Sequence, residues 1–231
     1  MKTVGIIGGI GPESTIEYYR GIIAAYRARQ EDGDYPAILL NSINLKKTLG
    51  WFEAHDWARA SEYLFGEIQR LALSGADFGV LASNTHHVVF EELRQQSPIP
   101  LLSIVEATCE AVQALGLSKV GLFGTRFIMQ GRFYLDAFAR AGITVTVPAQ
   151  DEQSYIHDKY LGELVPGIFL PETRAGLLAI VDQMIEQQGI KGLILGGTEL
   201  PLILREATYR DIPFLDTTKI HVNRIVTQML S

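Results

Sequence analysis

The chain has 231 residues, 47% hydrophobic and 20% charged, so it can form one large globular domain or two small ones. Its net charge of −6 and its scattered basic residues exclude a basic nucleic-acid groove. No run approaches the roughly 18 to 20 apolar residues of a membrane span, and the single cysteine, Cys109, excludes an intrachain disulfide, so we expect a cytoplasmic protein.

Short apolar runs alternate with longer amphipathic runs, a pattern typical of βαβ units and a mostly parallel sheet. Strands are predicted over residues 3–8, 37–41, 78–82, 101–102, 120–124, 144–147, 193–196 and 214–215. Helices are predicted over residues 12–29, 57–73, 88–95, 104–115, 132–141, 152–164, 172–188, 201–204 and 218–230. The fold class that this order indicates is α/β.

Three segments recur in the same order at nearly one offset. VGIIG, from Val4, resembles VGLFG, from Val120, at an offset of 116 residues; IPLL, from Ile99, resembles IPFL, from Ile212, at an offset of 113. The segment after Gly75 resembles the segment 114 residues later. We therefore predict two similar Rossmann-like (flavodoxin-like) halves, residues 1–115 and 116–231, with the C-terminal helix able to cross back to the first half. A pseudo-twofold relation between them would create a ligand cleft between the halves.

The first candidate loop is Gly-Gly-Ile-Gly-Pro-Glu-Ser-Thr, between a predicted strand and a predicted helix. Gly9 and Gly11 allow close backbone approach, and the N-terminus of the helix offers free N–H groups to an anion. Ser14 stands where a Rossmann fingerprint needs glycine, and no Gly-Lys-Ser/Thr follows, so neither nucleotide motif is present. A tight turn without a ligand is the alternative interpretation.

Two further loops follow predicted strands. Ser83-Asn84-Thr85-His86-His87 offers hydroxyl and amide groups that can cap a helix or bind a carboxylate. Adjacent histidines point apart and no His-x-His or His-Glu-x-x-His spacing occurs, so we expect no metal site. In the second half, the loop from Gly196 to Glu199 reads by itself as a turn into a short helix. Cys109 lies on the apolar face of its helix, where we expect a buried packing residue.

Together these motifs resemble those of the cofactor-independent aspartate/glutamate racemases. The segments concerned are Gly-Gly-Ile-Gly-Pro-Glu-Ser-Thr, Asn84-Thr85-His86-His87, Val120–Gly124 with Thr125, and Gly196-Gly197-Thr198-Glu199-Leu200. The resemblance runs from end to end and implies an isomerase of acidic amino acids that works without pyridoxal phosphate or a metal. In that family two thiols face the substrate α-carbon from opposite sides, because inversion needs a base on one face and an acid on the other.

This chain departs from the family at both thiol positions, which hold Ser83 and Gly197. Some members replace the first cysteine by a hydroxyl residue, but glycine has no side chain with which to move a proton. Either Gly197 is natural and the thiol mechanism is gone, or it is a laboratory substitution that silences the enzyme. We therefore expect activity to be weak or absent.

The resemblance also implies roles for other residues. Those that would bind the substrate are Gly9, Gly11, Asn84, Thr85, Thr125 and Thr198. His87 would shape the loop, while His86 or Glu199 would be a substitute proton carrier. Some aspartate racemases place a lysine where this chain has Leu164-Val165-Pro166. Here Lys46, Lys47 or Arg126 would bind the side-chain carboxylate of the substrate instead.

Three functions remain open. The first is a racemase-family isomerase, and the second is a non-catalytic binder of an acidic amino acid or a related dicarboxylate. The third, decarboxylation or isomerisation of dicarboxylates with a single thiol, is least favoured because those relatives need the cysteine. The family generally forms homodimers, for which Trp51, Phe52 and Trp57 are candidate exposed aromatics. The expected partner is a small molecule, with no nucleic acid and no membrane.

Overall fold

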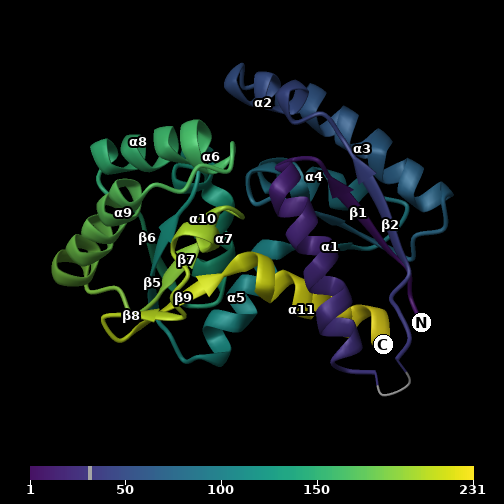
Figure 1. The fold of residues 1–231 in the computed structure, drawn as a ribbon. Coiled ribbons are helices and arrows are strands. Elements are labelled where there is room, and N and C mark those ends of the chain that lie inside the picture. Colours follow the sequence, from purple (N-terminus) through teal and green to yellow (C-terminus); the bar gives the residue numbers. More distant parts are fainter. Residues whose placement is uncertain (31–32) are drawn as a thin grey trace. The chain divides into compact units, whose positions relative to one another are not determined.

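The computed structural model describes residues 1–30 and 33–231, which divide into two compact units (Figure 1). Unit 1 comprises residues 1–104 and 221–231, and unit 2 comprises residues 105–220. The chain leaves unit 1 at the start of helix α5 (Ile104–Ala114) and returns within helix α11 (Thr217–Leu230). From the sequence we predict a boundary after residue 115, with a C-terminal helix able to cross back to the first half.

Unit 1 contains a four-stranded sheet in the order β2-β1-β3-β4, with every neighbouring pair parallel. The strands are β1 (Val4–Gly8), β2 (Ile38–Ser42), β3 (Phe78–Leu81) and β4 (Leu101–Leu102). Val4 pairs with Ile38 on one side and with Phe78 on the other. All four lie within a residue or two of their predicted positions.

The helices of unit 1 pack on both faces of this sheet. They are α1 (Pro12–Arg27), α2 (Leu45–Glu53), α3 (Trp57–Leu73), the 3₁₀ turn η1 (Thr85–Val89), α4 (Phe90–Gln96) and the C-terminal part of α11. Successive side chains of a strand point to opposite faces. Accordingly Val4 and Ile6 pack with α1 and α11, whereas Ile7 packs with α3 and α4.

Unit 2 repeats this strand order in the parallel sheet β6-β5-β7-β9 and adds the antiparallel edge strand β8. The strands are β5 (Lys119–Phe123), β6 (Thr144–Thr146), β7 (Leu193–Leu195), β8 (Thr208–Tyr209) and β9 (Ile212–Asp216). The prediction of two similar α/β halves with mostly parallel sheets is thus confirmed.

The helices of unit 2 are α5, α6 (Arg126–Met129), α7 (Arg132–Arg140), α8 (Gln150–Lys159), α9 (Pro171–Gln183) and α10 (Leu200–Ile203). Helices α8 and α9 each run on into a π-helical turn, η2 (Tyr160–Leu164) and η3 (Met184–Gln188) respectively. Their apolar sides pack with Phe123, Leu193 and Leu195 of the sheet. The sequence did not predict α2, α6 or β8.

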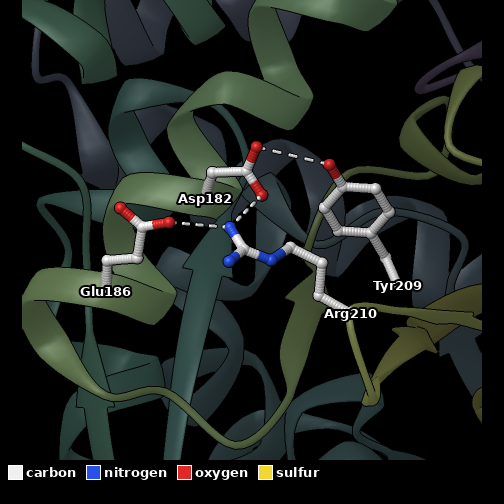
Figure 2. Close-up of polar contacts among 4 residues, drawn as sticks. All are labelled: Asp182, Glu186, Tyr209 and Arg210. Atoms are coloured by element: carbon white, nitrogen blue, oxygen red, sulfur yellow. Dashed lines mark hydrogen bonds and ion pairs between the residues drawn. The ribbon is translucent and has the colours of Figure 1, made fainter.

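The β8–β9 hairpin turns through two residues, Arg210 and Asp211, with left-handed φ values of 46° and 64°. This conformation suits a two-residue hairpin turn but is unfavourable for residues other than glycine. Figure 2 shows how the turn is held: the Arg210 guanidinium lies 3.0 Å from Asp182 and 2.9 Å from Glu186. The Tyr209 hydroxyl also donates to Asp182, at 3.3 Å. These contacts tie the hairpin to α9 and η3.

Candidate functional site

The predicted site residues gather at the carboxyl ends of neighbouring central strands in each unit. In unit 1 the ends of β1 and β3 are joined by a hydrogen bond from the Ala82 amide to the Ile7 carbonyl, at 2.9 Å. In unit 2 the Gly196 amide donates to the Phe123 carbonyl, at 2.8 Å, and so joins the ends of β7 and β5. The structure therefore brings the loops at residues 8–12 and 83–87 together in unit 1, and those at 125–127 and 197–200 together in unit 2.

The glycine-rich turn between β1 and α1 has positive φ at Gly9 and Gly11, 78° and 114°. The Gly9 amide donates to the Thr15 hydroxyl at 2.9 Å, and the hydroxyls of Ser14 and Thr15 both donate to the Gly11 carbonyl at 2.8 Å. Thr15 thus occupies the Gly9 donor that we had expected to face a ligand. The turn is fixed by its own side chains.

Replacement of Gly9 by alanine tests this close packing. Its Cβ would lie 2.7 Å from both the Ile43 amide nitrogen and the Ser42 hydroxyl oxygen. Gly75 also has positive φ, 95°, but nothing lies near its Cβ position. Gly75→Ala should therefore lower the free energy of unfolding by about 1–2 kcal/mol, the cost of a left-handed conformation for alanine. Gly9→Ala should lower it by more, because its Cβ also overlaps neighbouring atoms. Urea unfolding of both variants measures the difference, and equal losses would contradict the assignment.

Ser83, His86 and Thr48 form a buried hydrogen-bonded chain in unit 1. Ser83 Oγ lies 2.9 Å from His86 Nδ1, and His86 Nε2 lies 2.9 Å from the Thr48 hydroxyl of helix α2. The Thr48 hydroxyl donates onward to the Leu45 carbonyl at 3.0 Å. His86 is 1% exposed, and burial lowers its pKa to about 3. A neutral imidazole therefore contacts the serine at the first thiol position.

The His87 ring, unlike that of His86, bonds to backbone atoms. Its Nδ1 lies 2.8 Å from the Ser83 carbonyl oxygen, and its Nε2 accepts the Ile104 amide proton at 3.2 Å. The ring stacks on Phe90, with centroids 4.5 Å apart and planes 9° from parallel. Burial, followed by the nearby His221, lowers the pKa of His87 to about 3. Both ring nitrogens of His87 thus bond backbone atoms of unit 1.

In unit 2 the ring of Tyr160 occupies the space beside Gly197. A Cβ at position 197 would lie 2.8 Å from Cζ and 2.9 Å from the hydroxyl oxygen of Tyr160. Tyr160 is the first residue of the π-helical turn η2 and is 7% exposed. The turn η2 places the Tyr160 ring against the loop at Gly197, and π-helical turns often occur at functional positions. Gly197 and Tyr160 are matched in size.

Glu199 holds the Tyr160 ring in this position. Its Oε2 accepts a hydrogen bond from the Tyr160 hydroxyl and another, of 2.8 Å, from the Thr198 hydroxyl. Burial and the neighbouring Glu199 raise the pKa of Tyr160 well above its usual value. Tyr160 therefore stays protonated, and Thr198 directs its hydroxyl to Glu199.

The remaining predicted residues divide by exposure. Asn84, Thr85 and Thr125 are buried at their strand ends, whereas Lys46, Lys47 and Arg126 are exposed. The side chain of Lys47 lies over the Tyr63 ring, 4.7 Å from its centroid. Cys109 is buried as expected, and burial raises the pKa of its thiol.

The aromatic residues that we had considered for a dimer surface need one correction. Phe52 is fully buried, because its ring packs against Trp57 and His86 at centroid distances of 5.4 and 4.8 Å. Trp51 and Trp57 are half-buried. Phe52 therefore supports the imidazole of His86 and offers no exposed surface.

Other features of the described residues lie apart from these loops. A cavity of about 280 Å³ in unit 2 is lined by residues of α9, α10 and the segments beside them, including Arg174, Arg205 and Glu206. Among residues 1–30 and 33–231, the structure has no group of three or more histidine, cysteine or acidic side chains placed to bind a metal ion. In the same part of the chain, no helix combines the length and the apolar character needed to cross a bilayer.

The two similar α/β units both carry glycine and hydroxyl groups at the carboxyl ends of their central strands, which is where α/β folds bind ligands. The Asp/Glu/hydantoin racemase family model matches residues 7–225, and the chain belongs to this family.

Individual relatives agree with this assignment. The broad-specificity amino-acid racemase RacX of Bacillus subtilis is 25% identical over 221 residues, which cover 93% of this chain and 92% of RacX. A candidate Asp/Glu racemase from Yersinia pestis has a TM-score of 0.90 and 31% identity, with 100% of each chain covered. An aspartate racemase homologue from Pyrococcus horikoshii has a TM-score of 0.84 and 30% identity, also with 100% of each chain covered. The resemblance inferred from the motifs is confirmed.

Proposed function

We propose that this chain binds an acidic amino acid and moves its α-proton through Ser83 and His86. The observation that carries the proposal is the 2.9 Å contact between Ser83 Oγ and His86 Nδ1 in a buried site. A serine hydroxyl is a weak base by itself and needs an adjacent base that can take its proton. The neutral His86 imidazole lies at this distance and can take the proton, but its lowered pKa makes it a weak base, so we expect slow exchange.

The second thiol position of the family holds no proton carrier in this chain. Gly197 has no side chain, and the nearest hydroxyl, that of Tyr160, is held by Glu199. Because its pKa is raised, the Tyr160 hydroxyl stays protonated, so it is a poor base, and it is also a weak acid. We infer that this chain exchanges the α-proton of one enantiomer faster than it inverts the centre, so that racemisation is weak or absent.

The test is α-proton exchange in heavy water, followed by NMR with each enantiomer of aspartate and glutamate. We expect exchange with retained configuration for one enantiomer. Ser83→Ala and His86→Gln should each lower its rate by about 10²–10⁴-fold, because each removes the acid–base group. Ser154→Ala is the control, since that hydroxyl bonds the Gln150 carbonyl of its own helix. Exchange that survives both site variants would contradict the proposal.

The alternative is a binder without catalysis. The packing of Tyr160 against Gly197 favours it, because that packing takes the space of a second proton carrier. In that case neither wild type nor Ser83→Ala exchanges the proton, yet aspartate or glutamate raises the melting temperature of both. Asn84 and Thr85 of unit 1 are the proposed carboxylate ligands in either function.

We further propose a cytoplasmic homodimer that works without a cofactor. The family resemblance supports all three parts of this proposal, and two exposed apolar side chains on α1, Ile16 and Tyr19, at 44% and 47% exposure, support the dimer. Their spacing of three residues puts them on one helix face. Sedimentation of wild type and Ile16→Lys, Tyr19→Lys separates a dimer from a monomer.

A further inference from the structure

The hydroxyl of Thr48 ends the hydrogen-bonded chain that begins at Ser83, and it comes from a helix that the motif analysis did not include. We propose that Thr48 is a positioning residue, which holds His86 in the tautomer whose Nδ1 accepts the Ser83 hydroxyl proton. This inference rests on the proposed function, since it explains how the serine is made basic.

The first step concerns the single proton of the Thr48 hydroxyl. It is donated to the Leu45 carbonyl, 3.0 Å away in the first turn of α2. A hydroxyl has one proton and two lone pairs, so Thr48 presents only lone pairs to its other neighbour. That neighbour is His86 Nε2, at 2.9 Å, which must therefore carry the ring proton.

The second step follows from the chemistry of a neutral imidazole. Such a ring has one donor nitrogen and one acceptor nitrogen, and burial keeps His86 neutral. With the proton on Nε2, Nδ1 is the acceptor. Ser83 Oγ, 2.9 Å from it, then donates its hydroxyl proton to Nδ1.

The third step is the consequence for proton transfer. As the substrate α-proton bonds to Ser83 Oγ, the original hydroxyl proton passes to Nδ1, and the other ring proton stays on Nε2, hydrogen-bonded to the Thr48 hydroxyl oxygen. The α-carbanion and an imidazolium result, so charge and protons balance. In the opposite tautomer Nδ1 already carries a proton, and Ser83 has no base to receive its own.

Helix α2 is built to hold this arrangement. Thr48 is fully buried, and the Phe52 ring, one helical turn further along, packs 4.8 Å from the His86 ring. Asn44 caps the helix N-terminus by accepting the Lys47 amide proton at 3.4 Å. One face of α2 thus fixes both the tautomer and the ring plane of His86.

The neighbouring histidines provide internal references for a test. His87 must carry its proton on Nδ1, because its Nε2 accepts the Ile104 amide proton. His221 must carry its proton on Nε2, which bonds the Leu102 carbonyl at 3.2 Å, while its Nδ1 lies 2.8 Å from the Tyr18 hydroxyl. Both tautomers are therefore represented among the buried histidines of one unit.

The experiment is long-range ¹H–¹⁵N correlation of the histidine rings in wild type, Thr48→Ser and Thr48→Val, with His86→Gln to assign His86. Wild type and Thr48→Ser should show His86 protonated at Nε2, and Thr48→Val should show protonation at Nδ1. In the exchange assay, Thr48→Val should lower kcat at least about tenfold with KM unchanged, and Thr48→Ser should restore it.

Each outcome decides the matter. A wild-type His86 protonated at Nδ1, or a Thr48→Val variant that keeps both tautomer and rate, would overturn the positioning role. If the tautomer follows Thr48 but wild type exchanges no α-proton, the positioning role stands and the proposed function fails. The wild-type spectrum is decisive even if Thr48→Val does not fold.

Discussion

Gly197→Cys, the substitution that restores the second thiol of the family, should destabilise unit 2 by about 3 kcal/mol and should not restore activity by itself. The new Cβ would overlap the Tyr160 ring, whose Cζ lies 2.8 Å from that position. Tyr160 cannot move aside freely, because its ring belongs to the apolar core of unit 2 and Glu199 binds its hydroxyl. Urea unfolding followed by circular dichroism measures the loss.

Two second-site variants separate ring size from the hydroxyl. Tyr160→Leu removes all three Tyr160 atoms that the Cβ would meet, Cε2, Cζ and the hydroxyl oxygen. Tyr160→Phe removes only the hydroxyl and keeps the steric block. In a double-mutant cycle, Gly197→Cys should therefore be tolerated in the leucine background and not in the phenylalanine background, with a coupling of about 2 kcal/mol. Additive losses in both backgrounds would refute the size match.

The Tyr160→Leu background also allows the effect of a thiol at position 197 on activity to be measured without loss of the fold. A thiol at position 197 has room there, so Gly197→Cys with Tyr160→Leu tests whether the second proton carrier alone was missing. Racemisation by this double variant, together with exchange by wild type, would assign the one-sided chemistry to Gly197. Gly197→Cys in the wild-type background mixes loss of fold with gain of a thiol.

Acidification should unfold unit 1 steeply. His86, His87 and His221 are buried there, and burial lowers the pKa of each to about 3, from about 6.5 in an unfolded chain. Between these values the unfolded state binds more protons, so stability is full above about pH 6.5 and is lost as the pH falls towards 3. Three such groups give a slope of about 4 kcal/mol per pH unit. With a typical stability of about 5–15 kcal/mol, unit 1 should unfold near pH 4.

The measurement can be restricted to unit 1, because both tryptophans, Trp51 and Trp57, belong to it. Urea unfolding followed by tryptophan fluorescence from pH 7 to pH 4 gives the slope. His221→Gln should lower it by about one third, since one proton fewer is taken up. His55→Gln is the control, because that side chain is exposed. A slope unaffected by His221→Gln would show that other groups cause the acid unfolding.

The sequence predicted the sheets well because their strands are short, apolar and bounded by glycine or polar residues. It missed α2, whose residues 45–53 include Lys46, Lys47 and Gly50 and resemble an exposed connection. The available signal was Asn44, a good N-terminal cap residue, four positions before Thr48. Because α2 was missed, so was the partner of His86.

Contacts between residues of one motif could be predicted from the sequence. Contacts made by residues from distant segments could not. Ser83 and His86 lie in one loop, so their proximity could be expected. Tyr160 is far from Gly197 in the sequence, and a glycine carries no indication of which side chain fills the space beside it. Its position also depends on the π-helical turn η2, which shifts the register of the helix and has no simple sequence signal.

The division of the chain has a consequence for its synthesis on the ribosome. Residues 221–231 supply Val222, Ile225 and Val226 to the core beside β1, although β1 is synthesised before all of unit 2. Residues 105–220 emerge as one continuous stretch and can fold as soon as they leave the exit tunnel. One face of the N-terminal sheet therefore stays uncovered until residues 221–231 have been synthesised. We therefore expect unit 2 to fold before unit 1, the reverse of the usual order in which the N-terminal domain folds first.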